Sequence, residues 1–376
     1  MPNTRSASQE PRLFRTLRQD VGVVWNDIGR IGIRQTFRRS LSDLEAFYLT
    51  THRRDELAAM GRGQRAIYLL LWLLKALFLK LTPARRLLLL VGICLIALHS
   101  SVRFGDTTRA TFDLQPLGIL LVLLVLMLEL KDKLLARSEL EAGRAVQLAL
   151  MPDRAPQLAG WDFWLFTRSA NDVGGDLVDF LSMTPTRLAI TLGDVAGKAL
   201  PAALLMAKLQ ATIRALAAQT ASLGELGRLV NRILCRDGLP NRFATLVHLE
   251  LMPDDGHVRL LNAGHMPPLV RSTSISELPR GSIALGITPD ADFHEQQFDL
   301  APGDVLLAYS DGVTEAMNRA GDFFGDDRLR QVFGAAGDLT AEQIGRRVLA
   351  SVDAFTGDAP IHDDLSLVVV KRPRAL

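Results

Sequence analysis

The sequence predicts an α+β layered domain that follows a transmembrane helical hairpin and a helical linker. From Trp161 onward, short apolar runs alternate with turns rich in Gly, Asp, Asn and Pro, which is typical of strands. Helical stretches lie in blocks between these runs, near 200–218, 222–236, 327–335 and 340–355, and this arrangement favours an α+β fold. Ahead of them, a chain of 376 residues that is 48% apolar carries three long apolar runs.

The N-terminal region 1–65 is basic and holds 12 arginines. It has neither the apolar core nor the small-residue cleavage site of a secretory signal peptide. The net charge of the whole chain is only +2, and the C-terminal half carries no basic stripe, so no nucleic-acid partner is expected. We expect 1–65 to be a cytoplasmic segment that contacts anionic lipid. The two cysteines, Cys94 and Cys235, support neither a disulfide framework nor a thiolate metal site.

The apolar runs predict a transmembrane hairpin over 87–130, with spans at about 87–102 and 114–130. Neither span has a central charge, and each is near the lower length limit of roughly 17 residues for a crossing. Basic residues flank the pair on both outer sides, which predicts that both flanks face the cytoplasm. The run before them contains lysines, so 66–82 is expected to be an amphipathic helix at the membrane interface. The alternative is that all three runs are buried helices of a soluble protein.

Residues 131–152 are predicted to form a helical linker. Leucines and valines mark an apolar stripe on an otherwise charged helix, and Pro152 ends it. The segment suits a coiled coil with a second copy in a homodimer, and a solvated connector remains the alternative.

Four turns that contain aspartate indicate where chemistry could occur. They are 171–180, 192–199, 308–316 and 362–370, and in the last three the acid lies at the end of a strand. Carboxylates that meet at one edge of a sheet repel one another unless a cation neutralises them. Oxygen ligands without paired His or Cys favour Mg²⁺ or Mn²⁺ over zinc. Two such ions can generate hydroxide at neutral pH, so no nucleophilic side chain is required. Taken singly, each turn could equally be an Asx-turn.

The ordered motifs VGGD, GDVAGK, NAGHMPP, SDGVTEA and DDLSLVVV resemble the metal-dependent (PPM-type) Ser/Thr protein phosphatases, in their SpoIIE/RsbU-like branch. The stretch RAVQLALMP resembles the helix that leads into such a domain, so the resemblance covers roughly 144–372. It implies a four-layer α-β-β-α sandwich over 153–373, with two divalent cations, Mn²⁺ or Mg²⁺, at one edge. Ala199, Val178 and Ser366 depart from the usual pattern, but none of them removes a carboxylate.

The resemblance also implies which residues form the site. The catalytic carboxylates would be Asp176, Asp194, Asp311 and Asp363. Metal ligation would add the Val195 carbonyl, with Asp364 as a further candidate. Candidates around the metals or on the substrate side are Asp179, Gly175, Lys198 and Gly312. No role is assigned to His265.

The implied function is hydrolysis of phosphoserine or phosphothreonine, on a phosphorylated STAS-type anti-anti-sigma protein in a bacterial partner-switching pathway. The expected location is the bacterial inner membrane, with several crossings and the catalytic domain in the cytoplasm. The linker is expected to transmit a signal by rearranging a dimer. The alternatives are a catalytically silent binding scaffold with the same fold, and a two-metal phosphoesterase that acts on nucleotides.

Overall fold

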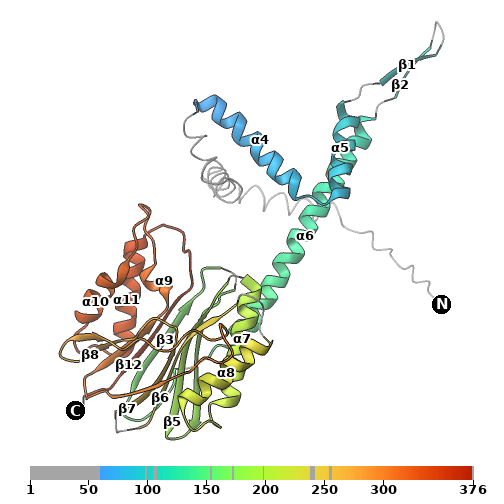
Figure 1. The fold of residues 1–376 in the computed structure, drawn as a ribbon. Helices are drawn as coiled ribbons and strands as arrows, with labels where there is room; N and C mark the ends of the chain where they lie inside the picture. Colours follow the sequence, from blue (N-terminus) through green and yellow to red (C-terminus); the bar gives the residue numbers. More distant parts are fainter. Residues whose placement is uncertain are drawn as a thin grey trace, which may run out of the picture. The chain divides into compact units, whose positions relative to one another are not determined.

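The computed structural model describes two compact units of the chain, which the contacts divide at Asp132 (Figure 1). The described residues are 60–374, apart from 98–99, 105–107, 113, 153–154, 172, 198, 238–241 and 254–255. Most of the predicted basic segment 1–65 therefore lies outside the described residues, and so does Lys198.

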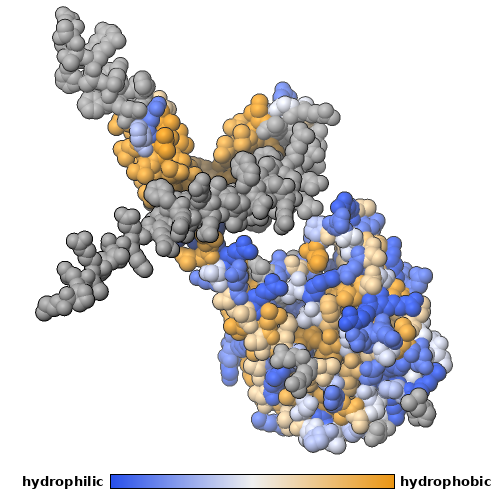
Figure 2. Space-filling model, turned by 180° about the vertical axis from the view of Figure 1, so that it is seen from behind, coloured by the Kyte–Doolittle hydropathy of each residue, from blue (hydrophilic) through white to orange (hydrophobic). Residues whose placement is uncertain are grey.

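The N-terminal unit consists of helices and one β-hairpin. Its elements are α4 (Arg62–Lys80), α5 (Pro83–Ala97), β1 (Ser100–Phe104), β2 (Thr108–Phe112) and the first part of α6 (Gln115–Leu150). Helices α5 and α6 pack closely, because a Cβ on Gly118 would lie only 2.6 Å from the carbonyl oxygen of Gly92. Arg85 links the same two helices through Glu129 and Asp132, at 2.7 Å each. Apolar side chains dominate the surface of these helices (Figure 2).

The predicted transmembrane hairpin, and with it the inner-membrane location, is wrong. No helix in the described part of the chain has both the length and the apolar composition that a bilayer crossing requires. Helix α5 has 15 residues, roughly 22 Å at about 1.5 Å per residue, which falls short of a hydrocarbon core of about 30 Å. Helix α6 has 36 residues, but Glu129, Lys131 and Asp132 interrupt its apolar stretch.

The C-terminal unit begins within α6 and contains two five-stranded antiparallel sheets. Sheet one has the strand order β10-β7-β6-β5-β4 and sheet two has the order β3-β12-β11-β8-β9. The strands of sheet one are β4 (Leu177–Thr184), β5 (Arg187–Val195), β6 (Ala244–Leu251), β7 (His257–Ala263) and β10 (Glu295–Asp299). The strands of sheet two are β3 (Asp162–Arg168), β8 (Leu269–Arg271), β9 (Ile275–Glu277), β11 (Val305–Tyr309) and β12 (Leu365–Lys371).

Helices cover the outer face of each sheet, as the predicted four-layer sandwich requires (Figure 1). Helices α7 (Ala199–Leu216) and α8 (Leu223–Asp237) pack on sheet one, and α10 (Gly325–Gly334) and α11 (Ala341–Thr356) pack on sheet two. A third apolar cluster lies between the sheets and includes Ile190, Leu192, Val247, Ala308 and Val368. Side chains along a strand alternate between its two faces. The residues two positions beyond those of this cluster therefore also point between the sheets. These positions carry the polar groups described below.

Candidate metal centre

The predicted carboxylates meet at one edge of the sandwich, where strands of both sheets end. Asp176 immediately precedes β4, and Asp194 is the penultimate residue of β5. The register pairs Leu177 with Gly193, so the two acids are neighbours across these strands. In sheet two, Asp311 opens the short helix α9 (Asp311–Thr314) directly after β11, and the pair at 363–364 precedes β12. Strands β11 and β12 are paired, which brings these acids to the same edge.

The carboxylates lie close enough together to raise one another's pKa values. Burial raises the pKa of Asp176 well above its usual range, and the negative charges of Asp194 and Asp364 raise it further. Burial is also the main cause that raises the pKa of Asp194 to about 6, together with the charges of Asp311, Asp363 and Asp364. The pKa of Asp311 is raised by burial and then by Asp363. Several acids that hinder one another's ionisation form a site suited to a cation.

Asp176 shows most directly that a positive charge fits this edge. Its carboxyl group is 3% exposed, and its Oδ2 atom is buried without a hydrogen-bond partner. Hydrogen bonds from Ser366 and Ser310 favour the charged form and partly oppose the effect of burial on its pKa. Among the described residues, no group of three or more acidic, histidine or cysteine side chains is placed so that it could hold a metal ion. An unpartnered buried carboxylate oxygen beside other acids nevertheless matches the oxygen-rich ligand sets of Mg²⁺ and Mn²⁺.

Asp364 uses its carboxylate differently from its neighbours. Its Oδ1 accepts the N–H of Ala170 at 2.8 Å, and its Oδ2 accepts the N–H groups of Gly175 at 2.5 Å and Asp176 at 3.4 Å. The side chain is 7% exposed. Asp363, in contrast, is exposed, and its Oδ1 accepts only the N–H of Asp364 among the hydrogen bonds of the described residues. The carboxylate of Asp364 thus anchors the turn that carries Asp176, whereas that of Asp363 is exposed to solvent and lies close enough to Asp311 to raise its pKa.

The glycines of the first motif leave room for the ligands. A Cβ on Gly175 would lie 3.0 Å from the carbonyl oxygen of Val195 and 3.4 Å from Oδ1 of Asp194. These two oxygens therefore border one small space, which a side chain at position 175 would fill. Gly312 packs against the backbone carbonyl of Asp364 and has no room for a Cβ.

One of the remaining candidates does not join the carboxylates. Asp179 points to the opposite face of β4, where its oxygens accept two hydrogen bonds from Arg214 of α7 at 2.7 and 2.6 Å. Lys198 lies outside the described residues.

Arg242 is a cation at this edge that the sequence analysis missed. It donates from Nη1 to the carbonyl oxygen of Ala196 at 2.8 Å, and its guanidinium lies directly against Gly197.

A second missed group connects the site to α6. Gln147 is 4% exposed, and its side-chain amide binds both backbone polar groups of Gly174. Its Nε2 donates to the Gly174 carbonyl at 2.9 Å, and its Oε1 accepts the Gly174 N–H at 3.1 Å. The motif RAVQLALMP contained this glutamine, but the apolar stripe of the helix did not distinguish it.

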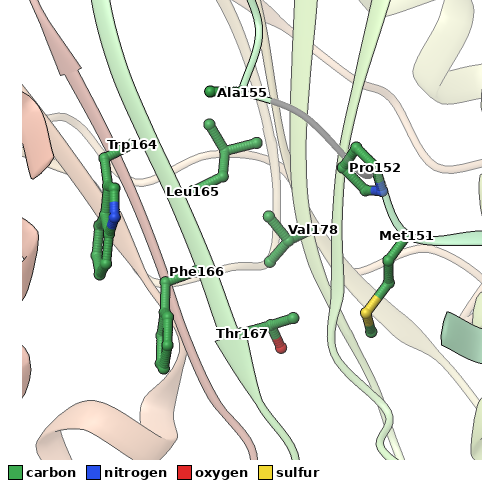
Figure 3. A pocket seen from close by; sticks show the side chains of 8 residues that line it. All are labelled: Met151, Pro152, Ala155, Trp164, Leu165, Phe166, Thr167 and Val178. Atoms are coloured by element: carbon green, nitrogen blue, oxygen red, sulfur yellow. The ribbon is translucent and has the colours of Figure 1, made fainter.

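A cavity of about 280 Å³ opens between the edge strands β3 and β4. Leu165, Thr167 and Val178 face it from the strands, and Met151 and Pro152 border it on the other side (Figure 3). Its lining is mostly apolar and carries no acid, so it differs from the carboxylate edge. It is linked to that edge through Thr167, whose hydroxyl lies 2.8 Å from that of Ser366.

Comparison with known proteins agrees with this geometry. The family described as stage II sporulation protein E (SpoIIE) matches residues 184–373, about half of the chain. The protein IcfG of Synechocystis is 27% identical over 273 residues, which cover 65% of this chain and 43% of IcfG. The phosphoserine phosphatase RsbU of Bacillus subtilis is 26% identical over 239 residues, which cover 63% of this chain and 70% of RsbU.

The fold has a counterpart among solved structures. The SiaA-PP2C domain of Pseudomonas aeruginosa superposes with a TM-score of 0.56 at 18% identity, covering 64% of this chain and 98% of that domain. This likeness supports the PP2C-type α+β sandwich. The chain matches less than half the length of IcfG.

Proposed function

The chain belongs to the SpoIIE family, and on that premise we propose that it is a metal-dependent protein phosphatase that hydrolyses phosphoserine or phosphothreonine. The observation that carries this proposal is the group of acids from both sheets whose pKa values are raised together, with one carboxylate oxygen of Asp176 left unpartnered. Divalent cations would neutralise the negative charge of such a group and so remove the cost of burying it.

The residues that would hold two cations, Mn²⁺ or Mg²⁺, are Asp176, Asp194 with the Val195 carbonyl, Asp311 and Asp363. When bound, such ions supply hydroxide from water at neutral pH and offset charge on the phosphoryl oxygens. The chain's own contribution is to orient the ligands: Asp364 accepts the N–H groups of Gly175 and Asp176 and so anchors the turn before β4. No side chain need attack phosphorus.

Arg242 is the residue that we assign to the phosphate of the substrate. A guanidinium group recognises phosphate oxygens through charge-assisted hydrogen bonds, and among the described residues one donor of Arg242 is bound, by the Ala196 carbonyl. Its bond to the Ala196 carbonyl places the guanidinium group one residue along the chain from the Val195 carbonyl, a proposed metal ligand. Lys198 in the same turn is a further candidate.

The substrate that we propose is a phosphorylated STAS-type anti-anti-sigma protein. The support is the similarity to RsbU, a phosphoserine phosphatase, together with the motif set quoted above. We also propose that α6 pairs with its copy in a homodimer and conveys a signal to the catalytic unit. Gln147 supports this idea because it joins α6 to the turn that bears Asp176.

The decisive experiment is to incubate the full chain with Mn²⁺ and a phosphorylated STAS-type protein, and to measure released phosphate. The wild type should release phosphate, and Asp194→Asn should not. Asp299→Asn is the matched control, because this exposed acid lies on the edge strand β10 and pairs with His257 at 2.9 Å. Turnover of nucleotides but of no phosphoprotein would contradict the proposed substrate class. Binding of the phosphoprotein without turnover would indicate a scaffold instead.

A further inference from the structure

We propose that His265 is a positioning residue that ties the two sheets together at the carboxylate edge and so sets the spacing with which Asp194 and Asp311 receive a cation. This inference rests on the proposed function, because it assigns a role toward the cations of that site. His265 is 7% exposed and follows β7, between the two sheets.

The turn NAGH is built to aim this side chain. The Oδ1 atom of Asn262 accepts the N–H of His265 at 2.9 Å, which closes the turn. Gly264 has a φ of 70°, in the left-handed region that favours glycine. A Cβ at this position would lie 2.6 Å from the backbone nitrogen of Ala284, so a larger residue would displace the turn. The local sequence therefore fixes where the imidazole points.

Both ring nitrogens of His265 are occupied, each by a different sheet. Nδ1 lies 2.7 Å from the hydroxyl oxygen of Thr245 on β6, and Nε2 lies 3.1 Å from the carbonyl oxygen of Tyr309 on β11. A carbonyl oxygen can only accept, so Nε2 carries the proton, and Nδ1 accepts from the threonine hydroxyl. The imidazole thus links sheet one to sheet two by two hydrogen bonds.

The two anchors of the imidazole lie next to two of the metal-ligand candidates. Thr245 is the direct cross-strand partner of Asp194, and its hydroxyl oxygen also lies 3.4 Å from the Asp194 carbonyl oxygen. Tyr309 ends β11, two residues before Asp311. Asp194 and Asp311 repel each other, as the raised pKa of Asp194 indicates. Without the imidazole of His265 between Thr245 and Tyr309, repulsion between the two acids would favour a larger distance between the sheets at this edge.

His248 provides a matched control within the same strand pair. It is 1% exposed, and its Nδ1 lies 2.9 Å from the hydroxyl oxygen of Thr191 on β5. Residues 245 and 248 point to opposite faces of β6, so His248 faces the helices and not the other sheet. Removing either imidazole empties a buried site beside a threonine, but only His265 reaches the carboxylate edge.

The test is calorimetric titration of the full chain with Mn²⁺ alone, for the wild type, His265→Ala, His265→Gln and His248→Ala. Loss of groups that orient metal ligands typically costs 10–100-fold in metal affinity, so His265→Ala should weaken Mn²⁺ binding by about that factor. His265→Gln keeps a donor that can reach Tyr309 and should give an intermediate affinity. His248→Ala should lower the unfolding temperature as His265→Ala does but leave the Mn²⁺ affinity unchanged.

Equal Mn²⁺ affinity in the wild type and His265→Ala would overturn the inference. Equal weakening in His265→Ala and His248→Ala would overturn it too, since a general loss of stability would then explain both. A wild type that binds Mn²⁺ but hydrolyses no phosphoprotein would leave the inference supported and refute the proposed function. A wild type that binds no Mn²⁺ would refute both.

Discussion

The adjacent acids Asp363 and Asp364 should respond in opposite ways to the same substitution. Each is changed to asparagine, which keeps the shape of the side chain and removes its charge. Asp363 is exposed and faces the site, so Asp363→Asn should abolish tight Mn²⁺ binding and leave the metal-free fold intact. Asp364 is buried and accepts backbone N–H groups of Ala170, Gly175 and Asp176, so Asp364→Asn should destabilise the fold itself.

The magnitude follows from the hydrogen bonds of Asp364. The bonds to Ala170 and Gly175 are short, at 2.8 and 2.5 Å, and they use different carboxylate oxygens. An asparagine retains one oxygen and turns an NH₂ group toward the other N–H. One charge-assisted bond is lost, and a buried donor is left unpaired, for a total of about 2–3 kcal/mol. In a unit of this size the unfolding temperature should fall by roughly 4–12 °C.

Differential scanning calorimetry in EDTA measures the stability, and calorimetric titration measures Mn²⁺ affinity. Asp363→Asn should unfold within about 1–2 °C of the wild type in EDTA and gain no stability from Mn²⁺, in line with the small effect of most exposed substitutions. The reasoning is refuted if Asp364→Asn unfolds like the wild type, or if Asp363→Asn is the less stable variant in EDTA. Either result would mean that the roles of the two acids are exchanged.

Three further predictions follow from the same contacts. The pKa of Asp194 is raised to about 6, so without metal the folded state retains a proton that the unfolded state loses above about pH 4. The unfolding free energy in EDTA should therefore fall by about 2 kcal/mol for this group as pH rises from 4 to 6, and calorimetry across pH tests this. Gln147→Ala leaves the N–H and C=O groups of Gly174 unpaired, which should lower the free energy of unfolding by about 1–3 kcal/mol. Hydrogen exchange at the Gly174 amide should become faster, and kcat should fall. Arg242→Gln should raise KM for a phosphoprotein roughly tenfold, with unchanged Mn²⁺ affinity by titration, because a charge-assisted contact to phosphate is lost.

Local patterns predicted the α+β layered domain and the turns that carry the acids, whereas the sandwich and the roles of the acids followed from the resemblance to the phosphatases. Alternating apolar runs identified the strands, and the helices expected near 222–236 and 340–355 are observed at Leu223–Asp237 and Ala341–Thr356. A strand-end aspartate such as Asp194 or Asp311 can be recognised because the strand before it is almost wholly apolar.

The groups that hold those acids in place could not be predicted, since they depend on contacts between distant segments. His265 looks like any turn histidine until Thr245 and Tyr309 are brought to either side of its ring. Asp364 could not be separated from Asp363 by pattern, because their difference is one of burial. The transmembrane hairpin was predicted from local apolar content, whereas a membrane crossing also depends on where each helix begins and ends.

The turn 174–176 is where three parts of the C-terminal unit meet. Gln147 of α6 holds Gly174 from one side, and Asp364 of sheet two holds the N–H groups of Gly175 and Asp176 from the other. The position of Asp176, and with it the binding of a cation there, therefore depends on both Gln147 and Asp364. A ligand that binds only the folded arrangement stabilises it by about 2.7 kcal/mol at a hundredfold excess over its Kd. By the same linkage, a shift of α6 that weakened either support would appear as weaker metal binding, so the metal affinity of the full chain reports the state of that helix.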